Sequence, residues 1–293
     1  MSLVPLRQGF GKILTEAEKL VKTSRHSRKL GVMSILVLSE EEIGAFVEKG
    51  FVVCSKLLSV NVCKHLKQIA EMHLDDLIAP IEYEVDVLYP GSPEDINAVG
   101  GKTSRRLLQA YARDAAFRDW ATSSEVRCAL GQLFGSPTGI MMSQCHHNCV
   151  MTKEPGFSSA TLWHQDIRYW SFDQENLISV WLALAEENKA NGCLRVIPGS
   201  HRQELDRGRL DASLFLRPDL PENKEMLKNA ELVELQAGDA LFFHCRLFHA
   251  AGRNLTTRPK LSPVFTYHQS GNRPIEGTRS ANYPSIPLPE KLL

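Results

Sequence analysis

Histidine and aspartate, two residue types that bind transition metals, lie two positions apart in the stretch 161–172, TLWHQDIRYWSF. The apolar and aromatic residues of this stretch favour a β-strand. Side chains alternate between the two faces of a strand, so His164 and Asp166 would project to the same side while Gln165 points elsewhere. We therefore expect an imidazole and a carboxylate where one metal ion can bind both.

A third ligand is available in the later segment 238–249, which contains two histidines. His244 and His249 are five residues apart, so they face opposite sides of a regular strand and only one can join His164 and Asp166. Two histidines and one carboxylate form the facial triad that suits ferrous iron and leaves three coordination positions open. The sequence thus predicts a non-haem iron site, with His244 and His249 as the competing third ligands.

Three further segments accompany these residues: a strand-like SVWLAL at 179–184, a turn-rich NGCLRVIPGSH at 191–201, and AAGRNLTTR at 250–258. Together with the HQD triplet they resemble the phytanoyl-CoA dioxygenase family of Fe(II)- and 2-oxoglutarate-dependent oxygenases. The resemblance runs from about Leu38 to Tyr267 and is most specific in HQD, in NGCLxVIPGSH and in FHxxxxHxxGxN followed by arginine.

The resemblance implies a mainly β fold with flanking helices, built on a double-stranded β-helix (jelly-roll, cupin-like) core. It favours His249 over His244 as the third ligand, because Gly252, Asn254 and Arg258 follow His249 in the family's order. It also implies Fe(II), 2-oxoglutarate as cosubstrate and O2, and a hydroxylation of an unactivated C–H bond that releases succinate and CO2.

The far carboxylate of 2-oxoglutarate needs a fixed cation, and the resemblance suggests Arg258, because a planar guanidinium grips a carboxylate through two parallel hydrogen bonds. A second basic residue is expected at the other end of the cosubstrate, where Arg105 and Arg106 are both possible. The resemblance places three more side chains near the cosubstrate: Trp181, Cys149 and Met151.

Four residues close to the expected ligands suit a small organic substrate that carries an anionic group and an apolar part, such as a small acid or acyl derivative: Lys153, Arg168, Tyr169 and Trp170. The neighbouring His146 and His147 lie among cysteines. Their spacing does not match a zinc site, and their roles stay open.

Composition narrows the class of protein. The chain has 293 residues, with 43% apolar and 23% charged residues, which is typical of a folded protein. Lys plus Arg and Asp plus Glu are both 34, so no basic excess suggests nucleic-acid binding. We see no apolar run of the ~20 residues that cross a bilayer and no secretion signal, and expect a cytoplasmic protein with a small-molecule substrate. Seven cysteines without a CxxC pair argue against a disulfide framework.

The element pattern predicts a basic helical extension at 1–33 and a single oxygenase domain at 34–293. Ser39 and Glu42 form a capping box that starts a helix ending near Gly50, followed by a strand at 51–54. Further expected elements are a helix capped by Ser59 or Asn61, a strand over 83–89, helices over 107–120 and 124–134, and strands over 141–153 and 261–268.

Two other classes of function remain open at this point. One is a non-catalytic barrel that binds a metal or a small acid as a sensor. The other is a metal-dependent hydrolase or isomerase on the same fold, which would need a general base near the metal and no bound keto acid.

Overall fold

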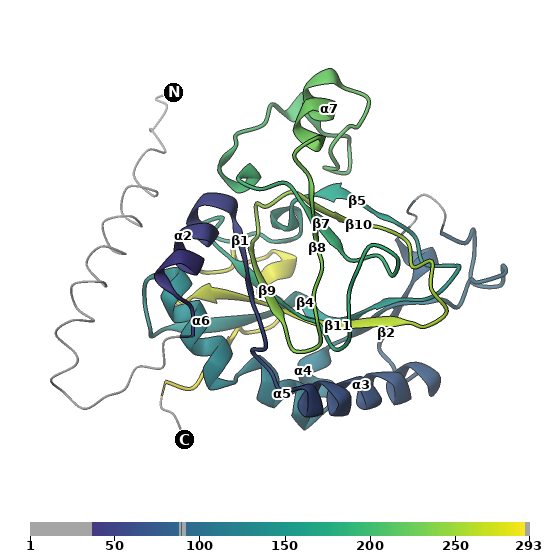
Figure 1. The fold of residues 1–293 in the computed structure, drawn as a ribbon, viewed down its shortest axis with the longest axis horizontal. Helices are drawn as coiled ribbons and strands as arrows, with labels where there is room; N and C mark the ends of the chain where they lie inside the picture. Colours follow the sequence, from purple (N-terminus) through teal and green to yellow (C-terminus); the bar gives the residue numbers. More distant parts are fainter. Residues whose placement is uncertain (1–36, 88, 90–91, 291–293) are drawn as a thin grey trace, which may run out of the picture.

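The computed structural model describes residues 37–87, 89 and 92–290, and in this part of the chain the strands form two antiparallel sheets (Figure 1). The larger sheet has the order β1-β9-β6-β11-β4-β3-β2, with β12 paired to β4, and the smaller has the order β5-β10-β7-β8. The strands are β1 (Phe51–Cys54), β2 (Ile81–Tyr83), β3 (Ser104–Leu108), β4 (Ile140–Lys153), β5 (Thr161–His164), β6 (Ile178–Leu182), β7 (Leu194–Val196), β8 (Glu231–Val233), β9 (Ala240–His244), β10 (His249–Ala251), β11 (Lys260–Gln269) and β12 (Ile286–Pro287). This is the jelly-roll architecture that the resemblance implies.

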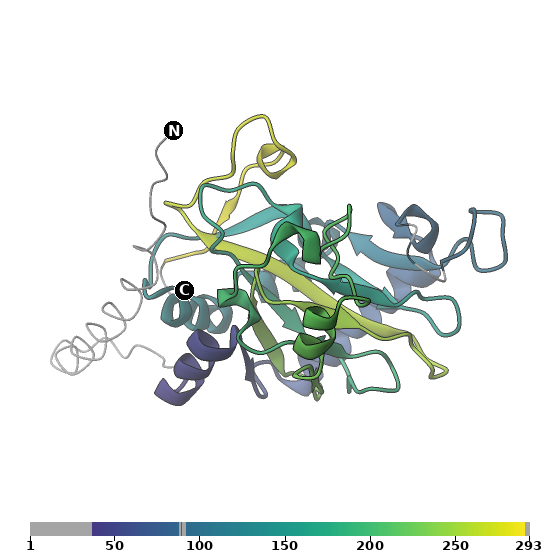
Figure 2. The ribbon, with the colours of Figure 1, turned by 90° about the horizontal axis from the view of Figure 1, so that it is seen from above.

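Helices α3, α4 and α5 lie below the larger sheet in Figure 1, and α2 and α6 lie at its left, where α2 contacts β1 and α6 contacts β4. Helix α7 lies on the opposite side of the molecule, toward the viewer in Figure 2. The helices are α2 (Glu40–Lys49), α3 (Val60–Asp75), α4 (Ala110–Arg113), α5 (Ala115–Ala121), α6 (Ser124–Phe134) and α7 (Pro221–Leu227). Their buried residues, such as Leu66 and Leu130, form one core cluster with Phe265 and Tyr267 of β11. None of the helices in the described residues is long and apolar enough to cross a bilayer.

Several elements predicted from local signals are confirmed. Ser39 caps α2 in a capping box with Glu42, and Gly50 ends the helix in the left-handed conformation. Ser59, rather than Asn61, caps α3 by accepting a hydrogen bond from the Val62 backbone. The strand at 51–54 and the helix at 124–134 have the predicted bounds. The predicted extension at 1–33 lies outside the described residues.

Three predicted elements are wrong, each where pairing with a distant segment or a local turn prevails over propensity. The strand expected over 83–89 ends at Tyr83 and gives way to a 3-10 turn, η1 (Glu84–Asp86). In place of the single helix expected over 107–120, the chain forms the end of β3, which pairs with β4, followed by the two short helices α4 and α5. The strand expected over 161–172 ends at His164, and the 3-10 turn η2 (Asp166–Tyr169) follows it.

Strand β4 is the longest in the described chain and pairs with β3, β11 and β12. Its pairing with β11 jumps from Asn148 to Ser143 between consecutive β11 residues, and His146 has a positive φ of 60°. Such a bulge breaks the alternation of side chains along a strand. The face on which His147 lies could therefore not be read from the sequence.

Candidate metal centre

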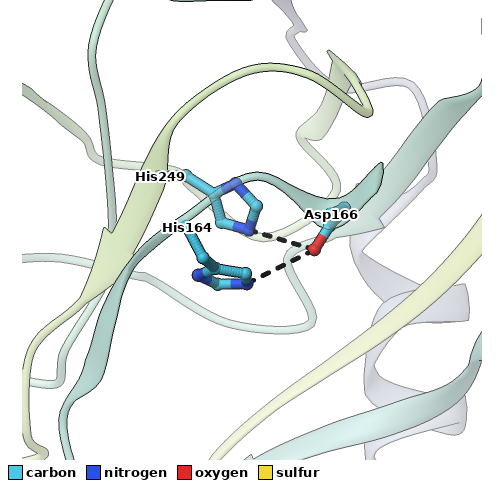
Figure 3. Close-up of side chains that lie close together, drawn as sticks. All are labelled: His164, Asp166 and His249. Atoms are coloured by element: carbon cyan, nitrogen blue, oxygen red, sulfur yellow. Dashed lines mark ion pairs between the residues drawn. The ribbon is translucent and has the colours of Figure 1, made fainter. Parts of the chain in front are cut away.

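The three predicted metal ligands converge (Figure 3). His164 ends β5 and His249 begins β10, and the two residues are direct partners across the antiparallel pair. Asp166 opens η2, two residues after β5. The Nε2 atoms of both histidines lie 3.4 Å from Oδ1 of Asp166, and all three side chains are buried. The site therefore presents one atom from each residue to a common point.

Backbone carbonyls fix which ring nitrogen of each histidine faces that point. Nδ1 of His164 lies 2.8 Å from the Leu162 carbonyl, and Nδ1 of His249 lies 3.0 Å from the Leu247 carbonyl. A carbonyl only accepts, so each Nδ1 carries a proton and each Nε2 is left free to offer its lone pair to a metal ion. Although burial alone would lower it, the pKa of His249 is raised by the Asp166 carboxylate, so a positive charge is favoured between these groups. The residues present thus fit a divalent metal ion.

Asp166 supports the same conclusion. Its side chain is fully buried, and neither oxygen has a hydrogen-bond partner among the described residues. Burial alone would raise the pKa of this carboxyl, but the surrounding imidazoles hold its pKa well below the usual value, so it stays ionised. Burial and the neighbouring His249 lower the pKa of His164 to about 4, which leaves its ring neutral and able to bind a metal.

His147 approaches the far side of Asp166. Its Nδ1 lies 3.4 Å from Oδ2 of Asp166 and 3.2 Å from Oγ of Ser179, which in turn lies 2.8 Å from Oγ1 of Thr266. Burial lowers the pKa of His147 to about 4. The sequence left the role of His147 open, and the only signal for it was a histidine within a predicted strand that precedes the ligands. His146 points elsewhere, and its ring packs near Tyr169.

His244, the competing third ligand, is not part of the cluster. It ends β9, its ring centroid lies 5.5 Å from that of His201, and its Nδ1 accepts a hydrogen bond from the backbone of Arg246. Within the described residues, His164, Asp166 and His249 are the one group of three with metal-binding geometry.

A cavity opens beside the ligands, between the interior faces of the two sheets. Six of the residues predicted to bind cosubstrate or substrate line it: Arg105, Arg106, Met151, Lys153, Tyr169 and Trp181. Apolar residues such as Leu194 and Phe243 complete its wall. A second hollow of about 680 Å³ lies at the surface near the end of α3 and contains none of the three metal ligands. Of these two cavities, the smaller is the one that borders the metal ligands.

Residues 46–262 match the family model described as phytanoyl-CoA dioxygenase (PhyH). The chain belongs to the phytanoyl-CoA dioxygenase family. Phytanoyl-CoA dioxygenase 1 of Oryza sativa is 34% identical over 104 residues, which cover 36% of this chain and 37% of that protein. Ectoine dioxygenase of Sphingopyxis alaskensis is 24% identical over 253 residues, which cover 80% of this chain and 78% of that protein. The matches to the rice, Arabidopsis thaliana and Caenorhabditis elegans relatives span 37% to 52% of the relatives' lengths.

Solved structures share the fold. EctD from S. alaskensis, solved with 2-oxoglutarate and 5-hydroxyectoine, superposes with a TM-score of 0.67 at 21% identity, covering 83% of this chain and 80% of EctD. The epimerase SnoN, solved with Fe3+, alpha ketoglutarate and nogalamycin RO, gives a TM-score of 0.65 at 20% identity, covering 85% of this chain and 95% of SnoN. These similarities show that the chain has the same double-stranded β-helix fold.

The prediction that Arg258 reaches into the cavity is wrong. Its side chain is exposed and does not line the cavity, while its carbonyl accepts a hydrogen bond from Asn254. Two residues later Lys260, the first residue of β11, is buried and does line the cavity. The basic residue that β11 directs into the cavity is thus Lys260, and the pairing of β11 with β4 sets the direction of its side chain.

Three other predicted residues do not line the cavity. Cys149 is fully buried, and its sulfur lies 3.8 Å from that of Met151, which does line the cavity. Arg168 stacks its guanidinium 3.9 Å from the ring centroid of Phe215. Trp170 donates its indole N–H to the Cys145 carbonyl in a separate apolar cluster. Arg168 and Trp170 lie in and directly after η2, where the alternation assumed for a regular strand does not apply.

Proposed function

We propose that this protein is an Fe(II)- and 2-oxoglutarate-dependent dioxygenase that hydroxylates an unactivated C–H bond of a small organic substrate and releases succinate and CO2. The observation that carries the proposal is the convergence of His164, Asp166 and His249 with both Nε2 lone pairs aimed at one point. Three protein ligands leave three coordination positions free for a keto acid and dioxygen. Membership of the phytanoyl-CoA dioxygenase family supports the same activity.

Ferrous iron, when bound, would supply the oxygen activation that amino-acid side chains cannot. The chain itself supplies the geometry. The carbonyls of Leu162 and Leu247 hold the two imidazoles in the tautomer that binds metal. The Asp166 side chain is buried, and the neighbouring imidazoles keep it ionised against the effect of that burial. Leu194 and Phe243 contribute apolar surface to the wall of the space beside the ligands.

The cavity also bears on the substrate class. Tyr169 lines it, and its hydroxyl lies 3.3 Å from that of Tyr89, so the two rings form an aromatic wall with polar ends. Cationic side chains line the rest of the polar surface, among them Arg105 and Lys153. This combination favours a substrate with an apolar part and an anionic group. The relatives' names refer to phytanoyl-CoA and to ectoine, and for this chain we propose only a small organic substrate of that character.

A spectroscopic experiment tests the activity before the substrate is known. Fe(II) and 2-oxoglutarate are added without oxygen, the visible charge-transfer band of a chelated keto acid is sought, and succinate is assayed after air is admitted. We expect a band and slow uncoupled succinate formation, both lost in His164→Ala. A protein that shows no band would instead be a hydrolase or isomerase, and a band without turnover on any substrate tested would indicate a sensor.

A further inference from the structure

The bulge in β4 is held in an unfavourable backbone conformation. Strand β11 pairs with Asn148 and then directly with Ser143, so the four residues 144–147 have no partner on β11. His146, within the bulge, has a φ of 60°, which few residues other than glycine adopt. Such a conformation persists only where the surrounding contacts hold it, and it is often found beside functional sites. The contacts of the bulge therefore indicate what it serves.

On its inner side the bulge supplies an imidazole to the metal centre. Nδ1 of His147 lies 3.4 Å from Oδ2 of Asp166. The two residues belong to separate parts of the fold, because His147 is in β4 of the larger sheet and Asp166 is in η2, after β5 of the smaller sheet. A group that contacts a metal ligand from behind helps to orient that ligand. This contact lasts only if the bulge and η2 keep their relative position.

Trp170 joins these two segments directly. It follows η2 and is buried, and its indole N–H donates a hydrogen bond to the Cys145 carbonyl at 3.2 Å. Its ring also packs edge-on against both histidines of the bulge, with centroid distances of 5.6 Å to His146 and 5.2 Å to His147. One side chain from the segment that bears a metal ligand thus contacts three successive residues of the bulge.

The C-terminal strap, residues 270–288, joins the same two segments a second time; it is drawn in yellow in Figure 2. Oγ of Ser280, a buried residue, accepts a hydrogen bond from the Ser171 backbone N–H at 2.9 Å. The carbonyls of Arg279 and Ser280 lie 2.9 Å and 3.7 Å from Sγ of Cys145. The strap follows residue 262, where the match to the family model ends. Family membership therefore assigns it no role.

We propose that Trp170 and Ser280 are positioning residues for the metal centre. Together they form a clasp that holds the bulge against η2 and so keeps His147 behind Asp166. Trp170 acts through the histidines of the bulge, and Ser280 acts through the backbone on either side of the clasp. The inference rests on the proposed function only for its metal site, and its test needs neither 2-oxoglutarate nor a substrate.

A weakened clasp has a specific consequence for Asp166. If the bulge relaxed toward a regular strand, the changed alternation of side chains would turn His147 away from the carboxylate. Neither oxygen of Asp166 has a hydrogen-bond partner among the described residues, so no other such bond would hold its orientation. Loss of a group that orients a ligand lowers metal affinity about 10- to 100-fold. We expect the lower end of this range, because the clasp acts through His147.

The test is a titration with Co(II), in which the visible absorption of the bound ion gives both a dissociation constant and a spectrum of the ligand geometry. Trp170→Phe keeps an aromatic ring and removes the indole N–H, and Ser280→Ala removes the hydroxyl that accepts from Ser171. Each variant should bind Co(II) about tenfold more weakly and show an altered spectrum. Ser280→Thr keeps a hydroxyl and should restore both values.

Two matched controls separate positioning from general loss of packing. Trp120→Phe changes a buried indole whose N–H has no partner among the described residues. Ser285→Ala removes a second hydroxyl of the strap, which lies 2.8 Å from Nε2 of His268 and not at the bulge. Both controls should keep the dissociation constant and the spectrum, even where the Tm measured without metal falls.

A Co(II) dissociation constant within about twofold of the unaltered protein's in both Trp170→Phe and Ser280→Ala would overturn the inference. Equal losses in the two controls would also overturn it, since the effect would then be one of packing alone. An unaltered protein that binds no Co(II) would instead remove the metal site, and with it the proposed function.

Discussion

Metal-dependent stability distinguishes the assigned third ligand from its competitor. His249 is buried and His244 is partly buried, but only His249 directs Nε2 at Asp166. A ligand that binds only the folded state stabilises it by about 2.7 kcal/mol when its concentration is a hundred times its dissociation constant. For a chain of this size, whose unfolding entropy is about 0.6 kcal/mol/K, that corresponds to an increase in Tm of roughly 4–5 °C.

We therefore expect Co(II), added at such an excess, to raise the Tm of the unaltered protein by roughly that amount. His249→Ala should abolish the increase, because only His164 and Asp166 remain to bind the ion. His244→Ala should keep it, although the lost packing against His201 lowers the Tm of that variant in the absence of metal.

Differential scanning fluorimetry with and without metal gives both values for each variant, so each protein serves as its own reference for folding. The result that would refute the reasoning is an increase that persists in His249→Ala and disappears in His244→Ala. That outcome would mean that the ion binds on the other face of the region between β9 and β10.

Three further outcomes are expected. His147→Phe should weaken Co(II) binding about 10- to 100-fold, because the substitution removes the ring nitrogen that faces Oδ2 of Asp166. His146→Phe should leave Co(II) binding unchanged; chelator competition measures both variants, and equal losses would contradict the assignment. Arg258→Ala should change the dissociation constant of 2-oxoglutarate less than twofold, since this side chain is exposed, and a tenfold loss would return it to the cosubstrate site. Because burial lowers the pKa of Lys153 to about 7, raising the pH above 7 removes a positive charge from the wall of the cavity, so affinity for the anionic 2-oxoglutarate should fall; an affinity that stays constant from pH 6 to 9 would show that this charge does not contribute to binding.

The elements that the sequence predicts well are those whose signals are local. The capping box of Ser39 and Glu42 and the left-handed Gly50 act within one helix, so they can be read without knowing the fold. The HxD pair is also a local signal. The structure has a junction between β5 and η2 at this point and not the continuous strand predicted, but His164 and Asp166 still converge. His249 needed the resemblance to known dioxygenases, because spacing alone left His244 open.

The errors arise where long-range pairing sets the direction of a side chain. Arg258 and Lys260 are two residues apart, so alternation along a strand would point both side chains to the same face. Because β11 begins at Lys260, only Lys260 belongs to the sheet and is buried, while Arg258 lies before the strand and is exposed. The bulge at His146 likewise determines that His147 meets Asp166. Glu187 lies in no recognisable motif, yet its side chain forms a buried ion pair with Lys260, which is 73 residues away. No local pattern encodes such a contact.

The direct pairing of His164 with His249 has a consequence for engineering. Because both imidazoles are borne by opposed residues of neighbouring strands, a shift of one residue between β5 and β10 would turn one of them to the reverse side of the smaller sheet. Variants with insertions or deletions in the loops between β7 and β10 can therefore be screened by the absorption spectrum or the magnetism of a bound cobalt ion. Retained signal reports native alignment of these strands without any knowledge of what the protein oxidises.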